Sequence, residues 1–219
     1  METIFGLDAS LRSWLEEDIG SGDITTLAIV GPEMETTGII HAKDTGVLAG
    51  VDVARREFAI LEPRILFDAK LEDGAQLKPG TIIAEVHGSA RAVLTGERLA
   101  LNLLQHMSGV ATRTAKLAAI AAPYGARLVD TRKTTPGLRL LDKYAVRVGG
   151  GSNHRLGLYD AMLIKDNHIK VAGGITAALE RAHAYASHMT KIEIEVESLD
   201  GVREALAGGA DVIMLDNMA

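Results

Sequence analysis

Strand-like and helical segments alternate in the second half of this 219-residue chain. After Pro123, short runs rich in β-branched residues recur between stretches with helical spacing. The strand-like segments are Arg127–Asp130, Ala161–Lys165, Lys191–Val196 and Asp211–Leu215, and the helical ones are Leu138–Val148, Ile175–Ser187 and Leu199–Ala207. Strands that alternate with helices form parallel βαβ units with right-handed crossovers. The pattern therefore predicts parallel βαβ units, as in an α/β barrel.

The first half of the chain has short β-branched segments separated by Gly, Asp and Pro, which is typical of a small antiparallel sheet. The expected strands are Gly38–Lys43, Val47–Val51, Ile65–Leu71 and Thr81–Val86, with a helix over Val53–Leu61. These elements predict an N-terminal α/β sandwich with a short antiparallel sheet.

A long helix rich in Ala and Leu is expected over Arg91–Ala122, with a break at Ser108-Gly109. We take this break as the boundary between two domains. Residues 1–109 would form the sandwich domain with the linking helix, and residues 110–219 would form the barrel domain.

Composition excludes several kinds of partner and chemistry. The formal net charge is -6, from 23 Lys and Arg against 29 Asp and Glu, and no basic run provides a footprint for nucleic acid. The chain has no cysteine, which removes disulfides, thiolate catalysis and cysteine-ligated zinc. No secretory signal and no apolar run of membrane-spanning length is visible. We therefore expect a cytoplasmic protein with no nucleic-acid or membrane partner.

Charged side chains follow the strand-like segments of the second half. The carboxyl ends of parallel strands form the active-site face of an α/β barrel, so these side chains are expected to converge. The basic ones are Arg132, Lys133, His154, Arg155 and Lys165. A cationic cluster in an acidic protein indicates an anionic substrate. The alternative is that strand ends are polar simply because they enter loops.

Carboxylates alternate along one strand-like segment, where Glu193, Glu195 and Glu197 are expected on one face. Buried carboxylates need a compensating cation. Glu195 and Asp216 offer only oxygen ligands, a set that favours Mg2+ or manganese. A structural ion-pair network with the lysines explains the same residues equally well, and the sequence leaves both interpretations open.

Several longer motifs lie along the chain, from the N-terminal helix to the last strand. They are Glu17–Asp23 followed by Ile24-Thr-Thr26, Glu97–Gln105, Ser108–Thr112, Asp130–Arg139, Lys143–Val146, Gly149–Arg155, Leu163–His168 and Leu215–Asn217. Taken together, these motifs resemble the quinolinate phosphoribosyltransferase family, also called nicotinate-nucleotide pyrophosphorylase (carboxylating). The resemblance covers essentially the whole chain, and its motifs are highly specific.

The resemblance implies a subunit with an N-terminal open sandwich and an incomplete α/β barrel. It implies a homodimer or a higher homo-oligomer whose active sites are shared between subunits. The implied reaction joins quinolinate to phosphoribosyl pyrophosphate with Mg2+, giving nicotinate mononucleotide, pyrophosphate and carbon dioxide in NAD biosynthesis.

The family's residues for quinolinate match positions of this sequence. The resemblance implies that the two substrate carboxylates are held by Arg132, His154, Arg155 and Lys165. It implies that Arg98 is contributed by the partner subunit.

The remaining implied roles concern the ribose side of the reaction. Thr131 and Lys133 share one strand-end loop, in which Lys133 would face both substrates. Glu195 and Asp216 would face the ribose and its Mg2+. The implied catalytic residues are Lys133, Lys165, Glu195 and Asp216.

The family continues past the Leu215-Asp-Asn217 strand with further βα units, including a Gly-rich turn for the ribose 5-phosphate, whereas this sequence stops at Ala219. The barrel is therefore expected to be short at its C-terminal side. Three other functions remain: a sister transferase of the ModD type with another base as acceptor, a Schiff-base aldolase that uses Lys165, and a binding-only or inactive member of the family.

Overall fold

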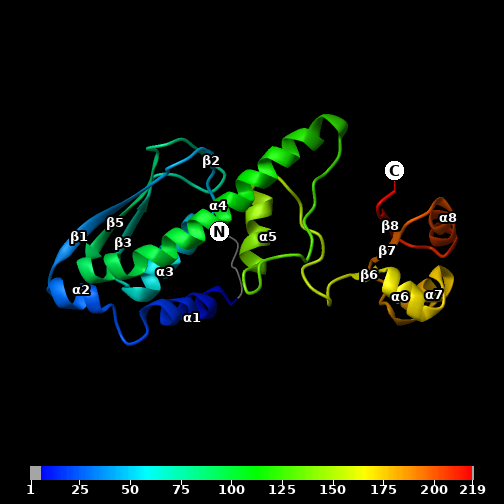
Figure 1. Cartoon of the computed structure of the whole chain (residues 1–219), viewed down its shortest axis with the longest axis horizontal. Helices are drawn as coiled ribbons and strands as arrows, with labels where there is room; N and C mark the ends of the chain where they lie inside the picture. Colours follow the sequence, from blue (N-terminus) through cyan, green and yellow to red (C-terminus); the bar gives the residue numbers. More distant parts are fainter. Residues whose placement is uncertain (1–5, 219) are drawn as a thin grey trace. The chain divides into compact units, whose positions relative to one another are not determined.

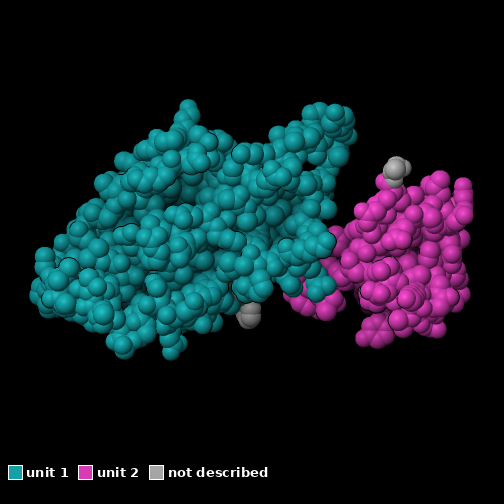
Figure 2. All heavy atoms as spheres, viewed as in Figure 1, with its two compact units in different colours: residues 1–153 teal, residues 154–219 magenta. Residues whose placement is uncertain are grey.

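The computed structural model describes residues 6–218, which form two compact units (Figures 1 and 2). Unit 1 ends at Asn153 and unit 2 begins at His154. The predicted domain boundary between residues 109 and 110 falls inside a long helix of unit 1. As a division between family domains, that boundary stays a prediction.

Unit 1 contains two antiparallel sheets. β1 (Glu35–His41), β5 (Ile82–Ser89) and β3 (Leu66–Ala69) form one in the order β1-β5-β3, and β2 (Gly46–Val47) pairs with β4 (Gln76–Leu77) in the other. Exposed and half-buried residues alternate along β1, as expected where one face of a sheet packs on a core. The predicted antiparallel sheet is therefore confirmed.

The helices of unit 1 are α1 (Leu7–Ile19), α2 (Ile24–Ile29), α3 (Val51–Leu61), α4 (Ala90–Ala121), the short 3-10 helix η1 (Ala122–Tyr124) and α5 (Arg139–Val148). Helices α3 and α4 pack against the strands of unit 1, and the other helices of this unit pack on α3 or α4. One core cluster contains Phe58 of α3 and Val86 of β5, and a second contains Leu11 of α1 and Met107 of α4. No helix in residues 6–218 is both long and apolar enough to cross a membrane.

Helix α4 passes through Ser108 and Gly109 without interruption, so the predicted break there is wrong. A glycine inside a helix costs about 1 kcal/mol relative to alanine. Burial on both sides offsets this cost, because Met107 and Ala111 are both 0% exposed. The Ser108 hydroxyl also accepts a hydrogen bond from the Ala49 backbone N–H at 3.0 Å.

Two of the predicted strands are also corrected. Pairing in the Val47–Val51 segment ends at Val47, because α3 begins at Val51 after Gly50 turns the chain with a φ of 103°. The Arg127–Asp130 segment is not a strand, since its ladder consists of a single parallel bridge between Val129 and Ser152.

Unit 2 is built on a parallel sheet in the order β6-β7-β8. Its strands are β6 (Met162–Ile164), β7 (Ile192–Val196) and β8 (Val212–Leu215), and its helices are α6 (Asp166–Ala172), α7 (Ile175–Tyr185) and α8 (Leu199–Ala207). The predicted alternation of strand and helix is confirmed, although α6 was not expected. Within the described residues the parallel sheet is open, and the barrel is not closed.

Candidate functional site

The 131–135 loop of unit 1 carries Arg132 and Lys133. The Thr131 hydroxyl accepts a hydrogen bond from the Lys133 backbone N–H at 3.0 Å, which folds the loop into a tight turn. Arg132 is half-buried, and its Nε is buried without a hydrogen-bond partner. Because an unpaired buried donor is costly, the loop presents a guanidinium group that an anion would satisfy.

His154 and Arg155 open unit 2. The His154 Nε2 lies 2.5 Å from Oε2 of Glu193. Arg155 donates from Nη1 to the Ala161 carbonyl oxygen at 3.1 Å, while its Nε is buried and lacks a hydrogen-bond partner. Arg132 and Arg155 thus each keep one buried donor unfilled.

Lys165 follows β6 directly and pairs with Glu195 of β7. Its Nζ donates hydrogen bonds to both carboxylate oxygens of Glu195, at 3.0 and 3.3 Å. Glu193 and Glu195 are half-buried, on the face opposite the buried isoleucines of β7. Glu197 lies beyond the end of β7 and is exposed, so the predicted three-carboxylate face holds two. The ion-pair interpretation with a lysine therefore describes Glu195, whereas the partner of Glu193 is His154.

Asp216 follows β8, and its backbone N–H donates to the Val196 carbonyl oxygen at 2.9 Å. Glu195 lies opposite Met214 in the parallel register, so Asp216 is expected on the same face of the sheet. No group of three or more His, Asp or Glu in residues 6–218 is arranged to hold a metal ion. Mg2+ often uses one or two protein carboxylates and completes its shell with water and substrate phosphates. The two carboxylates fit an ion of that kind.

A buried polar cluster behind the 131–135 loop was missed by the sequence analysis. Lys143 of α5 is 2% exposed, and its Nζ lies 2.6 Å from Oδ1 of Asp130. The Asn153 side-chain amide donates to Oδ2 of Asp130 at 2.7 Å and to the Lys143 carbonyl oxygen at 2.9 Å. A lysine flanked by the buried Leu141 and Ala145 of the same helix was the available signal.

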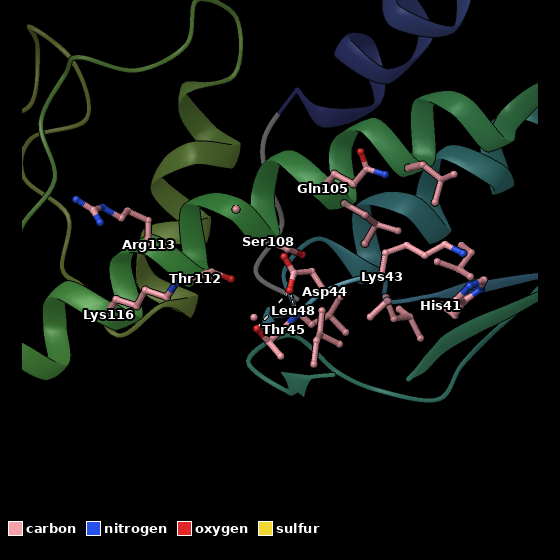
Figure 3. Close-up of a pocket in the computed structure, with 18 residues that line it drawn as sticks. His41, Lys43, Asp44, Thr45, Leu48, Gln105, Ser108, Thr112, Arg113 and Lys116 are labelled. Carbon is pink, nitrogen blue, oxygen red and sulfur yellow. Dashed lines mark hydrogen bonds between the residues drawn. The ribbon is translucent and has the colours of Figure 1, made fainter. Parts of the chain in front are cut away.

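The remaining predicted residue, Arg98, is exposed on α4. A cavity of about 510 Å³ in unit 1 lies between the β1–β2 region and α4 (Figure 3). Leu48 and Leu104 are among its apolar lining residues, and Lys43 and Lys116 are among its basic ones. None of the predicted site residues lines it.

Unit 2 has a cavity of about 380 Å³, lined by Arg155, His168 and mainly apolar residues. Arg155 is thus the one predicted site residue that borders either of these two cavities.

Comparison with known proteins gives the same family for both parts of the chain. Residues 23–108 match the family described as "Quinolinate phosphoribosyl transferase, N-terminal domain", and residues 110–219 match the corresponding C-terminal domain. A nicotinate-nucleotide pyrophosphorylase (carboxylating) from Mycobacterium leprae is 45% identical over 213 residues, which cover 95% of this chain and 74% of the relative. A probable nicotinate-nucleotide pyrophosphorylase (carboxylating) from Bacillus subtilis is 47% identical over 94% of this chain and 71% of the relative.

A solved structure extends this similarity to three dimensions. The crystal structure of NadC from Streptococcus pyogenes superposes with a TM-score of 0.95 at 45% identity. The match covers 100% of this chain and 78% of that one. The chain therefore belongs to the quinolinate phosphoribosyltransferase family.

Proposed function

We propose that this protein transfers the phosphoribosyl group of phosphoribosyl pyrophosphate to quinolinate and releases the adjacent carboxylate as carbon dioxide. The products are nicotinate mononucleotide, pyrophosphate and carbon dioxide, as in NAD biosynthesis. Family membership along both halves of the chain supports this function. The structural observation that supports it is that Arg132 and Arg155 each have a buried Nε without a hydrogen-bond partner, since guanidinium groups bind carboxylates.

Recognition of quinolinate is assigned to the basic side chains that the family resemblance implies. Arg132 and Arg155 would bind carboxylate oxygens, with His154 and Lys165 as further donors and Arg98 supplied in trans by a partner subunit. In the free protein His154 and Lys165 are held by Glu193 and Glu195. Quinolinate would compete with Glu193 and Glu195 for the hydrogen-bond donors of His154 and Lys165. Nicotinate has one carboxylate and would leave part of the basic set unmatched, which disfavours it.

Transfer begins at the anomeric carbon of the ribose. The pyridine nitrogen forms the new bond to this carbon as the bond to pyrophosphate breaks, and positive charge develops on the ribose. Glu195 and Asp216 would stabilise that charge, and Lys133 in the Thr131-containing loop would balance the departing pyrophosphate. Mg2+ held by Glu195, Asp216 and substrate oxygens would supply further charge neutralisation to the leaving group.

Decarboxylation follows ribosylation. Once the ring nitrogen carries the ribose it is cationic, so the electron pair left at the neighbouring carbon lies beside a positive charge. That carbon loses carbon dioxide and gains a proton, which gives the nicotinate ring. Lys165, whose Nζ is released from Glu195 when substrate binds, would hold the carboxylate at this stage. We assign the protein to a homodimer or higher homo-oligomer, and its cytoplasmic location stays a prediction.

The assay uses quinolinate, phosphoribosyl pyrophosphate and Mg2+, with chromatographic detection of nicotinate mononucleotide. The expected result is product formation with quinolinate and none with nicotinate as acceptor. A sister transferase would use another base, and a binding-only protein would show calorimetric binding of quinolinate without turnover. Borohydride trapping of a carbonyl substrate on Lys165 would instead indicate a Schiff-base aldolase.

A further inference from the structure

We propose that Lys143 is a positioning residue that holds the 131–135 loop in its anion-binding conformation through Asp130 and Asn153. This inference rests on the proposed function, because it assigns a purpose to the loop that carries Arg132. Lys143 itself is not assigned a contact with either substrate. It acts through Asp130, the residue that directly precedes the loop.

Asp130 is held by hydrogen bonds to its side chain and to its backbone. Its Oδ1 accepts from Lys143 Nζ at 2.6 Å, and its Oδ2 accepts from Asn153 Nδ2 at 2.7 Å. Asn153 Nδ2 also donates to the Lys143 carbonyl oxygen at 2.9 Å. The backbone N–H of Asp130 donates to the Ser152 carbonyl oxygen at 3.1 Å. The first residue before the loop is thus fixed through both its side chain and its backbone.

The far end of the loop is held by a second buried carboxylate, Asp142, which lies on α5 next to Lys143. Asp142 is 8% exposed, and its Oδ2 accepts the Thr135 backbone N–H at 2.9 Å. Its Oδ1 lies 2.5 Å from His106 Nε2 of α4. Adjacent residues of α5, Asp142 and Lys143, therefore hold opposite ends of the loop. Arg132 and Lys133 lie between these two anchors.

The positive charge of Lys143 matters as well as its hydrogen bond to Asp130. The side chains of Lys143 and Asp130 are 3% and 8% exposed, so neither charge is screened by bulk water. Without the ammonium group, the Asp130 carboxylate would lose a buried cationic partner directly before a loop that is proposed to bind a dianion. Lys143 therefore balances the charge of Asp130 at the base of the loop while it holds Asp130 in place.

The test replaces Lys143 with Met, which keeps a long side chain and removes the charge and the donors. Two quantities are measured on the folded protein: quinolinate affinity by calorimetry, and hydrogen exchange of the backbone amides of residues 131–135 without ligand. We expect Lys143→Met to weaken quinolinate binding by roughly ten- to a hundredfold, the scale on which small misplacements of binding groups act. We expect its loop amides to exchange faster than in the wild type.

A matched control separates positioning from general loss of stability. Val86→Ala removes buried volume from the sheet of unit 1, in a core cluster that contains neither Lys143 nor Asp130. It should lower the melting temperature and leave quinolinate affinity and loop exchange unchanged. An equal loss of affinity in Val86→Ala would overturn the proposal, as would wild-type affinity and exchange in Lys143→Met.

A double variant covers the case in which Lys143→Met fails to fold. Lys143→Met with Asp130→Asn removes both charges of the Lys143–Asp130 pair, and removing both partners of a buried pair is often tolerated. We expect this variant to regain thermal stability but to keep fast loop exchange. Recovery of wild-type exchange together with stability would overturn the positioning role.

The two measurements also distinguish failure of this proposal from failure of the proposed function. If the wild-type protein binds no quinolinate, the proposed function fails, but loop exchange still tests the role of Lys143. If quinolinate binds and Lys143→Met changes neither quantity, the function stands and the positioning role is wrong.

Discussion

Lys165 at the end of β6 and Glu195 on the neighbouring strand β7 form an ion pair, with Nζ 3.0 and 3.3 Å from the two carboxylate oxygens. The lysine side chain is 43% exposed and the glutamate side chain 16%. Lys165, which is assigned to quinolinate, is thus held by Glu195, which is assigned to the ribose. Binding of the dicarboxylate would release Glu195 for the charge that develops in the reaction.

This arrangement predicts different effects on binding and turnover when Glu195 or Asp216 loses its charge. Glu195→Gln and Asp216→Asn should lower kcat strongly, because the developing positive charge loses its stabilising carboxylate. Quinolinate affinity should not fall in either variant, because neither carboxylate attracts a dicarboxylate. It should rise in Glu195→Gln, because the neutral amide competes less well for Lys165. Steady-state kinetics and calorimetry check this pair of results. An equal loss of quinolinate affinity in both variants would make the carboxylates structural partners of the basic residues.

Arg132→Ala should weaken quinolinate binding by about 2–5 kcal/mol, because a buried anion then lacks a charged hydrogen-bonding partner. Arg127→Ala is the matched control, since Arg127 is exposed and precedes the same segment. Calorimetric titration of both variants measures the difference. Wild-type affinity in Arg132→Ala would remove Arg132 from the binding site.

Arg98 is expected to act in trans. Arg98→Ala and Glu195→Ala should each be inactive alone. After subunit exchange, half of the dimers are mixed and each mixed dimer has one complete site, so roughly a quarter of wild-type activity should return. The activity of the mixture is measured after exchange has been verified by mass spectrometry of differently tagged subunits. No recovery in verified mixed dimers would show that Arg98 acts within its own subunit.

Glu57 gives a prediction about pH and stability. It is 0% exposed between α3 and α4, and burial raises the pKa of its carboxyl group to about 8. The folded protein therefore keeps a proton on Glu57 that the unfolded chain releases above about pH 4.5. The free energy of unfolding should fall as pH rises from about 5 to 8, by up to about 1.4 kcal/mol per pH unit.

Glu57→Gln should remove this dependence, because its amide carries no charge at any pH. Chemical denaturation at several pH values between 5 and 8 checks the slope. Glu16→Gln, at an exposed position of α1, should leave it unchanged. If wild type and Glu57→Gln show the same slope, Glu57 is ionised in the folded protein.

The sequence was most informative where the pattern is local. The strands of unit 2 were predicted because Ile192, Ile194 and Val196 alternate with charged residues and the next helix begins within a few positions. The antiparallel sheet of unit 1 was recognised from short β-branched segments separated by Gly, Asp and Pro.

The predictions failed where partners are distant in the chain. The Lys143–Asp130 contact spans 13 positions and the Asn153–Asp130 contact 23, and no periodicity reveals either one. Burial of Glu57 depends on Gly96, whose missing side chain leaves room for the carboxylate: a Cβ there would lie 3.0 Å from its oxygen. The 127–130 segment has residues typical of strands, yet it forms only one isolated β-bridge, between Val129 and Ser152. A high β-propensity does not by itself provide a neighbouring strand to pair with.

The most direct test of the proposed reaction follows the carboxylate that is lost. The protein is incubated with Mg2+ and quinolinate labelled in the carboxyl group adjacent to the ring nitrogen, with and without phosphoribosyl pyrophosphate. We predict labelled carbon dioxide only when phosphoribosyl pyrophosphate is present, in equal amount to nicotinate mononucleotide. Labelled carbon dioxide without the second substrate, or nucleotide that retains the label, would contradict the account.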